Sequence, residues 1–247
     1  MTQKTNVTAA FVMIGDEILS GRTEDKNLNF LAKNLTEMGI NLREVRIVPD
    51  VENEIIFAVK AVQKKFDYIF TSGGIGPTHD DITSLAIAKA FDDELVQNTE
   101  ATKILEEYYG AENLNEARLK MAFVPSKAKL LDNPVSSAPG FRIENVFVMA
   151  GVPKIFQAMF DAASKELVTG KKIKSKEIKI SLTESVVAKD LEDLQKKYLQ
   201  ISMGSYPFEG GTALVFRGND YELLEKSVTE MIEILERIKS ASIIAVS

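Results

Sequence analysis

Apolar residues in the first part of the chain alternate between short continuous runs and helical stripes. Residues 7–14 (VTAAFVMI) form a continuous apolar run, which predicts a strand buried on both faces of a sheet. The next predicted elements are a helix at 27–38, a strand at 40–48, a helix around 55–62, a strand at 68–70 and a helix at 82–90. This alternation predicts a three-layer α/β fold with a mostly parallel sheet.

The pattern becomes less regular after residue 90 and then changes in kind. A helical stretch at 99–121, interrupted at Gly110, is followed by strand-like pieces near 128–131 and 145–149 and by a helix from Pro153 to about residue 167. Residues 169–176 (TGKKIKSK) lack apolar periodicity, which indicates a linker. We therefore expect an α/β domain over residues 1–168, a linker at 169–176, and a small β-α-β-β-α-β domain over residues 177–247 that resembles a KH unit.

Two residue counts narrow the chemistry. The 247 residues include no cysteine and a single histidine, His79. The absence of cysteine excludes disulfides, thiolate nucleophiles and zinc ribbons, and one histidine excludes sites with paired histidine ligands. We therefore expect carboxylates, hydroxyls, backbone amides and a hard metal ion to carry the chemistry, with His79 as a secondary candidate for phosphate contact.

The charge distribution bears on partners and location. The net charge of −6 lies entirely within residues 1–170, while residues 171–247 are neutral and lack a Gly-x-x-Gly loop, which argues against nucleic acid as a partner. The N-terminal apolar run is too short to span a membrane, and acidic residues follow it directly. We expect a cytoplasmic protein, without membrane attachment, that forms homo-oligomers.

The strongest motif is a glycine-rich loop at residues 71–83 (TSGGIGPTHDDIT), between a predicted strand and a predicted helix. Gly73, Gly74 and Gly76 allow the backbone amides to point at an anion. Asp80 and Asp81 follow, and a divalent metal would reconcile these carboxylates with a bound phosphate. The alternative is that one aspartate caps the following helix while the glycines form a tight turn.

Two other predicted strands end in acidic residues. Asp16 and Glu17 follow the first strand, and Asp50 follows the second. Because parallel strands present their carboxyl ends at one edge of a sheet, five acidic residues are expected to converge on one crevice. Alternatively, Asp50 is the N-cap of a helix that starts near Val51.

These residues carry a family resemblance that extends over almost the whole chain. The segments GDEILSG with Asn27, VPD, SGGIGPTHDDIT, NPVSSAPGF, VMAGVP, TESVVAKDL and MGSYPFEGG resemble the MoaB/Mog (molybdopterin-binding-like) superfamily. They resemble most closely the N-terminal region of the CinA (competence/damage-inducible protein A) family. The resemblance implies a metal-dependent nucleotide pyrophosphatase that acts on ADP-ribose-like or FAD-like substrates. The alternative is a binding protein for molybdopterin or a nucleotide, of the molybdenum-cofactor type, without hydrolase activity.

The resemblance also implies roles for particular residues. Asp50 and Asp81 would be catalytic, and Asp80 and Asp81 would hold Mg²⁺ or a similar ion. A nucleotide or pterin substrate would contact Gly15, Asp16, Glu17, Asn27, Ser72, Gly73, Gly74, Gly76, Pro77, Thr78, Thr83, Asn133, Pro139 and Gly140. The chain departs from the family pattern at Ser136 and Ser137, where Gly-Thr is usual. This departure weakens the expectation of a close backbone contact at Ser136.

Overall fold

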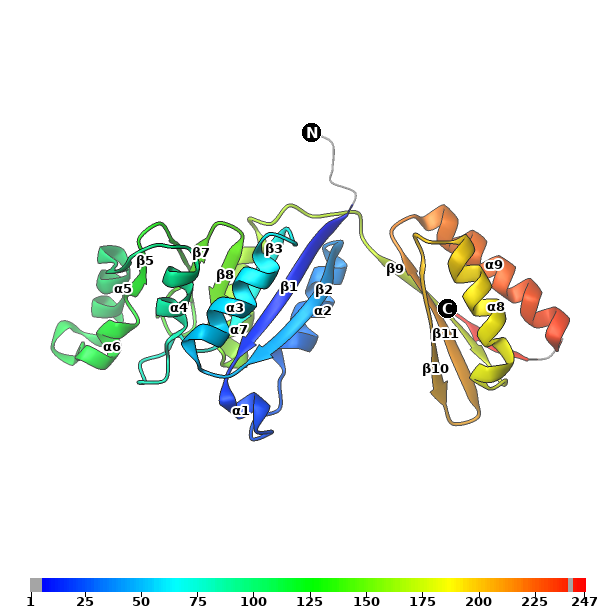
Figure 1. Cartoon of the computed structure of the whole chain (residues 1–247), viewed down its shortest axis with the longest axis horizontal. Helices are drawn as coiled ribbons and strands as arrows, with labels where there is room; N and C mark the ends of the chain where they lie inside the picture. Colours follow the sequence, from blue (N-terminus) through cyan, green and yellow to red (C-terminus); the bar gives the residue numbers. More distant parts are fainter. Residues whose placement is uncertain (1–5, 240–241) are drawn as a thin grey trace. The chain divides into compact units, whose positions relative to one another are not determined.

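A computed structural model describes residues 6–239 and 242–247 (Figure 1). Contacts divide the chain into two compact units. Unit 1 extends to Gly170 without residues 37–39, and unit 2 combines residues 37–39 with residues 171–247. None of the helices in the described ranges combines the length and apolarity that a membrane crossing requires.

Unit 1 is built on a six-stranded sheet in the order β2-β1-β3-β8-β7-β6. The strands are β2 (Ile40–Val48), β1 (Val7–Ile14), β3 (Tyr68–Ser72), β8 (Val146–Met149), β7 (Gly140–Ile143) and β6 (Lys129–Leu131). The first four are mutually parallel, whereas β7 and β6 are antiparallel to their neighbours. The mostly parallel α/β fold expected from the sequence is confirmed.

Helices cover both faces of this sheet (Figure 1). On one face, α3 (Glu52–Gln63) and α4 (Thr83–Ala90) pack on a cluster that includes Ala10, Val12 and Ile14 of β1. On the other face, α2 (Asn27–Glu37) and α7 (Pro153–Ser164) bring aromatic rings together, with the Phe11 and Phe156 ring centroids 5.7 Å apart. Because successive side chains of β1 point to opposite faces and both faces are covered, every β1 residue except one is buried.

An excursion between α4 and β6 carries a small antiparallel sheet and two helices. Its elements are β4 (Leu95–Gln97), α5 (Thr99–Tyr109), a 3₁₀ turn (Ala111–Asn113), α6 (Glu116–Lys120) and β5 (Phe123–Pro125). The N-cap side chains Asn98 and Asn115 accept hydrogen bonds from the Ala101 and Arg118 amides, which starts each helix locally. The sequence did not predict β4, β5 or the short α1 (Asp16–Leu19), because segments this short show no periodicity.

Unit 2 is a β-α-β-β-α-β sandwich. Its elements are β9 (Lys174–Ile180), α8 (Glu184–Lys197), β10 (Ser202–Phe208), β11 (Gly211–Gly218), α9 (Tyr221–Ile238) and β12 (Ile243–Val246). The antiparallel sheet has the order β10-β11-β9-β12, which is the ferredoxin-like (split βαβ) arrangement. The KH-like label is unconfirmed. Strand β9 begins at Lys174, so residues 174–176 of the expected linker belong to this sheet.

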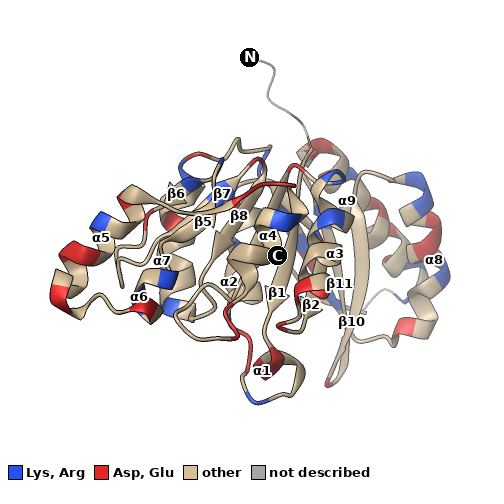
Figure 2. Ribbon diagram, turned by 60° about the vertical axis from the view of Figure 1, so that its left-hand side comes forward, with Lys and Arg blue, Asp and Glu red and all other residues tan. Residues whose placement is uncertain are grey.

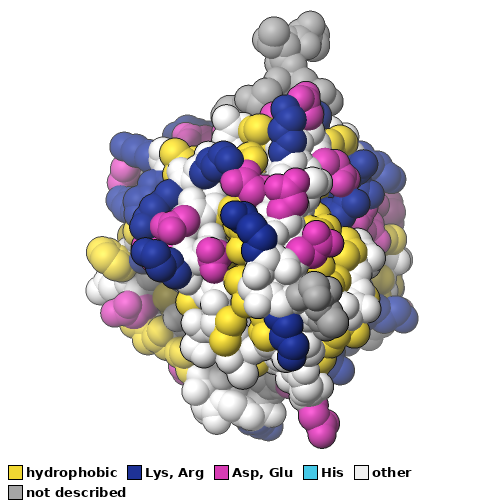
Figure 3. Space-filling view, turned by 90° about the vertical axis from the view of Figure 1, so that its right-hand side faces the viewer, with side chains coloured by type: hydrophobic (Ala, Val, Ile, Leu, Met, Phe, Trp, Pro, Cys, Tyr) yellow, Lys and Arg dark blue, Asp and Glu magenta, His cyan; other side chains and the backbone are white. Residues whose placement is uncertain are grey.

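The outward face of the unit 2 sheet carries mostly polar and small side chains on its central strands, with exposed Tyr206 on the neighbouring strand β10. The central strands β9 and β11 bury Ile178 and Leu214 beneath the two helices, so the alternate residues on these strands face away from the core. On β9 and β11 these alternate residues are Ser175, Glu177, Lys179, Ala213, Val215 and Arg217, and none is aromatic. Figure 3 shows basic and acidic side chains interspersed on one face of the unit. Because Tyr206 is exposed on this face, the expectation that nucleic acid is not a partner stays a prediction.

Candidate active site

The C-terminal ends of four parallel strands adjoin at one edge of the unit 1 sheet. Ile14 pairs with Val48, Met13 with Ser72, and Ser72 with Met149. The residues that follow these strands are Gly15, Pro49 and Asp50, Gly73, and Ala150 and Gly151. The structure therefore brings together the strand ends from which the sequence predicts a site.

Gly73 and Gly74 hold the glycine loop in a conformation that requires glycine. Their φ angles are +106° and +69°. A Cβ atom at Gly73 would lie 2.1 Å from the carbonyl oxygen of Ile14, and one at Gly74 would lie 2.1 Å from Thr83 Oγ1. The Thr83 amide donates to Gly74 O (2.9 Å) and the Thr83 hydroxyl donates to Gly73 O (3.0 Å). Buried Thr83 thus fixes the loop rather than facing a ligand.

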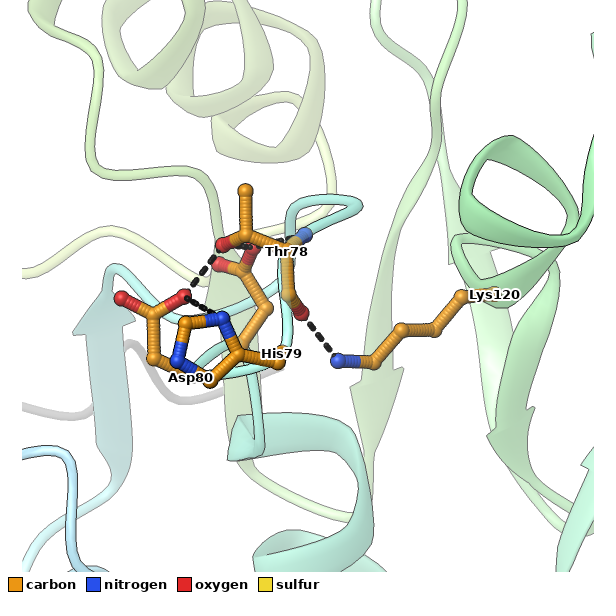
Figure 4. Close-up of polar contacts among 5 residues, drawn as sticks. Thr78, His79, Asp80 and Lys120 are labelled. Carbon is orange, nitrogen blue, oxygen red and sulfur yellow. Dashed lines mark hydrogen bonds and ion pairs between the residues drawn. The ribbon is translucent and has the colours of Figure 1, made fainter.

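Thr78, Asp80 and Asp81 form a compact polar turn at the exposed end of the loop (Figure 4). The Thr78 amide donates to Asp81 Oδ2 (2.8 Å), and the Thr78 hydroxyl contacts Asp81 Oδ2 (2.6 Å) and Asp80 Oδ1. The hydrogen bond from the Thr78 hydroxyl lowers the pKa of Asp80. The N-cap of α4 is Ile82, without a side-chain cap. The alternative that Asp80 or Asp81 caps the following helix is therefore wrong.

Gly76 and Pro77 connect the buried and exposed parts of this loop. A Cβ atom at Gly76 would lie 2.7 Å from Asp81 Oδ2, so glycine is needed for the carboxylate to approach the backbone. Pro77 is exposed. The backbone therefore passes from buried Gly73 and half-buried Gly74 to an exposed segment at residues 77–80.

Lys120 and His79 lie beside the turn formed by Thr78, Asp80 and Asp81 (Figure 4). Lys120 reaches from α6 and its Nζ donates to the carbonyl oxygen of Thr78. The His79 side chain is 98% exposed, and its Nδ1 lies 3.9 Å from Asp80 Oδ1. Sequence reasoning missed Lys120, since no sequence pattern connects positions 42 residues apart.

Asp50 faces the glycine loop from the end of β2. Its Oδ2 accepts a hydrogen bond from the Asp16 amide (3.0 Å), and its Oδ1 lies 3.6 Å from where a Cβ of Gly74 would stand. The N-cap of α3 is Val51, without a side-chain cap, so the N-cap alternative for Asp50 is wrong. Burial raises the pKa of Asp50, and the nearby carboxylates of Glu17, Asp16 and Asp80 add to the effect.

Acidic residues also lie on α1, directly after β1 (Figure 2). The side chains of Asp16 and Glu17 are exposed, and the Glu17 carboxylate folds back so that a Cβ at Gly15 would lie 2.4 Å from it. Gly15 itself is buried, and its amide donates to Val48 O (3.1 Å). A raised pKa beside a glycine loop and a group of acids is the combination expected at a functional site.

Asn27 joins the beginning of α2 to two strand ends. Its Nδ2 donates to Ser72 Oγ (2.9 Å) and to Gly151 O (2.8 Å), whereas its buried Oδ1 has no hydrogen-bond partner in the structure. A Cβ at Gly151 would lie 3.3 Å from the Cα of Gly73. Gly151 was missed in the sequence, although a glycine directly after a buried strand is a signal of close backbone approach.

The loop at residues 132–139 reaches the same sheet edge but is self-contained. Asn133 Nδ2 donates to Ser136 Oγ (2.7 Å) and Ala138 O (2.7 Å), and its Oδ1 accepts from the Val135 and Ser136 amides. Pro139 and Gly140 are buried, and a Cβ at Gly140 would lie 2.4 Å from Val148 O. Three strand spacings, about 14 Å, separate β6 from β3. The structure thus shows that Asn133 and Gly140 make structural contacts, while the expected contact of Asn133, Pro139 and Gly140 with a substrate stays a prediction.

The donor set for a metal is limited to carboxylates. Within residues 6–239 and 242–247, no group of three or more His, Cys, Asp or Glu side chains is placed to hold a metal ion. Asp80 and Asp81 both contact the Thr78 hydroxyl, so their oxygens lie close together on an exposed turn. Mg²⁺ is commonly held by one or two carboxylates together with substrate phosphates, and this pair fits that donor set.

Two protein-family models match consecutive parts of the chain. Residues 10–169 match the family described as a probable molybdopterin binding domain, and residues 172–243 match the middle domain of FAD synthase. The chain is also similar to a solved structure of the protein CinA, of unknown function, from Thermoplasma acidophilum. That similarity has a TM-score of 0.63 with 34% identity, over 66% of this chain and 99% of the other.

Two relatives differ in how much of their length is matched. A protein from Pyrobaculum calidifontis is 40% identical over 167 residues, which are 65% of this chain and 64% of that protein. A probable FAD synthase from Caenorhabditis elegans is 34% identical over 92% of this chain, which spans half of the synthase. Because the first family model covers well over half of the chain, and the CinA structure shares its fold, the chain belongs to the MoaB/Mog-like family of molybdopterin-binding domains.

Proposed function

We propose that the chain is a metal-dependent nucleotide pyrophosphatase that hydrolyses the diphosphate linkage of ADP-ribose-like or FAD-like substrates. The observation that carries the proposal is the backbone of residues 72–78 in the glycine loop. Asp50 lies near its start at Gly74, and Asp80 and Asp81 contact its end at Thr78. A loop of this kind offers backbone amides to an anion, while the carboxylates supply a base and oxygen ligands.

Different residues have different roles in the proposed hydrolysis. The amides of Gly74, Ile75 and Gly76 bind and orient the diphosphate, because the Gly73 and Thr78 amides already donate to Met149 O and Asp81 Oδ2 and Pro77 has no amide hydrogen. The fixed backbone of Gly73 and Gly74 keeps these amides in place before the substrate arrives. Asp50, whose raised pKa makes its carboxylate a better proton acceptor, positions or deprotonates the attacking water. Asp80 and Asp81 would hold a divalent ion, which supplies charge neutralisation at the phosphate oxygens when bound. Asp81 also shapes the loop through the Thr78 amide.

The comparisons support a nucleotide diphosphate as the substrate class. Residues 172–243 match the middle domain of FAD synthase, and a probable FAD synthase aligns over 92% of this chain. A protein that resembles part of a flavin-nucleotide enzyme is expected to bind a ligand with linked phosphates. The charge pattern agrees, because acidic residues around an anion site favour binding of the anion together with a cation.

The test is release of AMP from ADP-ribose or FAD by the full chain, with Mg²⁺, Mn²⁺, Co²⁺ or Ca²⁺ and with excess chelator. We expect turnover that requires a divalent ion. Absence of turnover with every ion would reject the hydrolase. Asp50→Asn and Asp81→Asn should each reduce the rate, with exposed Asp161→Asn on α7 as the matched control. Full activity in both active-site variants would show that the catalytic residues are wrongly assigned.

A second candidate is a pterin- or nucleotide-binding protein without hydrolase activity. The match of residues 10–169 to a probable molybdopterin binding domain favours it. Tight binding of a pterin phosphate without turnover of any diphosphate substrate would support this candidate over the first. The cytoplasmic location and the homo-oligomer stay predictions, and sedimentation analysis would measure the oligomeric state.

A further inference from the structure

A cavity of about 330 Å³ lies next to the glycine loop, between α4 and the small β4–β5 sheet. Five apolar side chains line most of its wall: Ile75, Ile82, Leu85, Leu95 and Phe123. All five are half-buried, in contrast to the fully buried Ala86 and Ile87 of the same helix α4. The cavity is therefore an accessible apolar hollow rather than a packing defect in the core.

The cavity is continuous with the proposed phosphate site. Gly76 and Asp81 line the cavity and also belong to the loop turn that contains Thr78. A molecule that occupied both places would carry an apolar group and a phosphate separated by a short connection. Pockets of this size, mostly apolar with a few polar groups, are typical of small-ligand sites.

Polar groups stand at the rim of the cavity. Lys120 and Glu116 reach it from α6, and Ser84 from the first turn of α4. The Lys120 ammonium contacts the Thr78 carbonyl oxygen, and in the part of the chain that the structure describes it forms no ion pair with a carboxylate. Together with the Thr78 hydroxyl, the charge of Lys120 lowers the pKa of Asp80, so this ammonium lies near the loop where a phosphate can accept a hydrogen bond from it.

We infer that this cavity binds the planar aromatic base of a nucleotide whose phosphate lies on the glycine loop, and that Lys120 contacts that phosphate. The inference rests on the proposed nucleotide function and adds to it the subsite for the base. Phe123 offers a ring face or edge to the base, and the aliphatic side chains exclude water from it. Ser84 and Glu116 can accept hydrogen bonds from an exocyclic amino group.

AMP and ribose 5-phosphate form a matched pair of probes, since they differ only in the adenine ring and neither contains a diphosphate bond. Their binding to the full chain, measured by calorimetry, is therefore independent of pyrophosphatase turnover. The wild-type chain should bind AMP at least about tenfold more tightly than ribose 5-phosphate, as expected for a stacked base. Equal affinities for the two probes would overturn the inference.

Two variants that fill the cavity test its position. Ser84→Phe should remove the preference for AMP while leaving the affinity for ribose 5-phosphate unchanged. Ser164→Phe, at a half-buried serine near the end of α7, is the matched control and should keep the preference. Leu95→Phe fills the cavity from the opposite wall if Ser84→Phe does not fold. A folded filled variant that still prefers AMP would place the base elsewhere.

Lys120→Gln tests the phosphate contact. It should weaken both probes by the same factor, about tenfold, because the lost interaction is a charge-assisted hydrogen bond to their common phosphate. Lys103→Gln, at an exposed lysine on α5, is the control. Unchanged binding in Lys120→Gln would exclude the contact. A chain that prefers AMP but hydrolyses no diphosphate would reject the proposed function and keep the base subsite.

Discussion

Two loops at the same edge of the unit 1 sheet use polar residues in opposite ways. In the glycine loop, Thr78 and Asp80 are exposed, and the amides of Gly74, Ile75 and Gly76 donate no hydrogen bond within the described part of the chain. In the loop at 132–139, all four hydrogen-bonding positions on Asn133 that the structure uses go to its own turn. The first loop therefore has hydrogen-bonding groups that a ligand can use, whereas the Asn133 side chain of the second loop is fully hydrogen-bonded within its own turn.

This difference shows that position at a strand end does not by itself make a residue functional. The two loops lie at the same edge, and both contain motif residues of the family. The two loops differ in the hydrogen-bond partners of their polar atoms, and these partners are known only from the three-dimensional structure. Variants in the two loops should therefore separate activity from stability.

Asp81→Asn in the glycine loop should have the largest effect, on activity. We expect a rate of ADP-ribose hydrolysis reduced by about 10²–10⁴-fold, because a carboxylate in the reaction site is lost. Stability should change little, since the asparagine oxygen can still accept from the Thr78 amide. Steady-state kinetics and thermal melting of the same preparation check both statements. If Asp81→Asn unfolds enough of the chain to account for the lost rate, Asp81 is a structural residue like Asn133.

Gly73→Ala should have the next largest effect, this time on folding. The added methyl group would meet the carbonyl of Ile14 in a backbone conformation that disfavours L-residues, and we expect a loss of at least about 3 kcal/mol of stability. Gly21→Ala is a matched control, since Gly21 also has positive φ (+71°) but has open space around it. Its cost should be only about 1 kcal/mol. Equal costs in urea titrations would contradict the steric argument.

Asn133→Ala should destabilise the chain by about 2 kcal/mol, because two half-buried amides and a half-buried carbonyl lose their partner. AMP affinity should stay within twofold of wild type in the folded fraction. Asn29→Ala, at an exposed asparagine on α2, serves as the control for the change of residue type. A stable variant with lost ligand binding would restore Asn133 to the substrate pocket.

Asp50→Asn should shift the pH dependence of stability. Since burial in the folded chain raises the pKa of Asp50 above its ordinary value, the folded state holds this proton more tightly than the unfolded state. The ionised carboxylate therefore costs stability at pH values above the folded pKa, and this cost is relieved as the pH falls through it. Asp50→Asn should have a higher melting temperature than wild type at pH 7, and the difference should disappear near pH 3.

The control for this pH effect is Asp161→Asn, at an exposed carboxylate on α7. It should leave the difference between pH 7 and pH 3 as in the wild type. A wild-type chain that is more stable than Asp50→Asn at pH 7 would mean that the carboxylate is stabilised rather than penalised by its surroundings.

Ser137→Gly in the second loop should have the smallest effect. Ser137 has a φ of +59°, so glycine relieves a left-handed conformation but adds entropy to the unfolded chain. We expect a gain of no more than about 1 kcal/mol, measured by urea titration. A clear loss would indicate that the Ser137 side chain makes a contact that supports the Asn133 turn.

The core and the main loop could be predicted from the sequence because their signals are local. A few neighbouring residues are enough to predict the buried strand at 7–14. The same is true of the glycine backbone at residues 73–76. Short elements such as β4 and β5 carry no periodicity, so the wall that bears Phe123 could not be predicted. The order of helices and strands along unit 2 could be predicted. The order of the strands within its sheet could not, because it depends on contacts between segments that are distant in the sequence.

The roles of individual side chains were harder to predict than their places. Asp50 and Asp81 were both candidate helix caps, and only the hydrogen bonds to Asp16 and Thr78 show what they do instead. Lys120 meets Thr78 only because the excursion folds back on the loop. Asn133 satisfies its own turn, and a sequence motif does not distinguish such a residue from one that contacts a ligand.

The fixed backbone of Gly73 and Gly74 affects the thermodynamics of ligand binding. This segment is held by Thr83, Met149 and the end of β1 before any ligand arrives, so it has little conformational entropy left to lose. A phosphate that binds there is met by a preorganised cradle, and ordering on binding is confined to the exposed residues 77–80. Binding of small anions should therefore carry a small entropic penalty. Hydrogen exchange should slow at residues 78–80 and change little at Gly73 and Gly74.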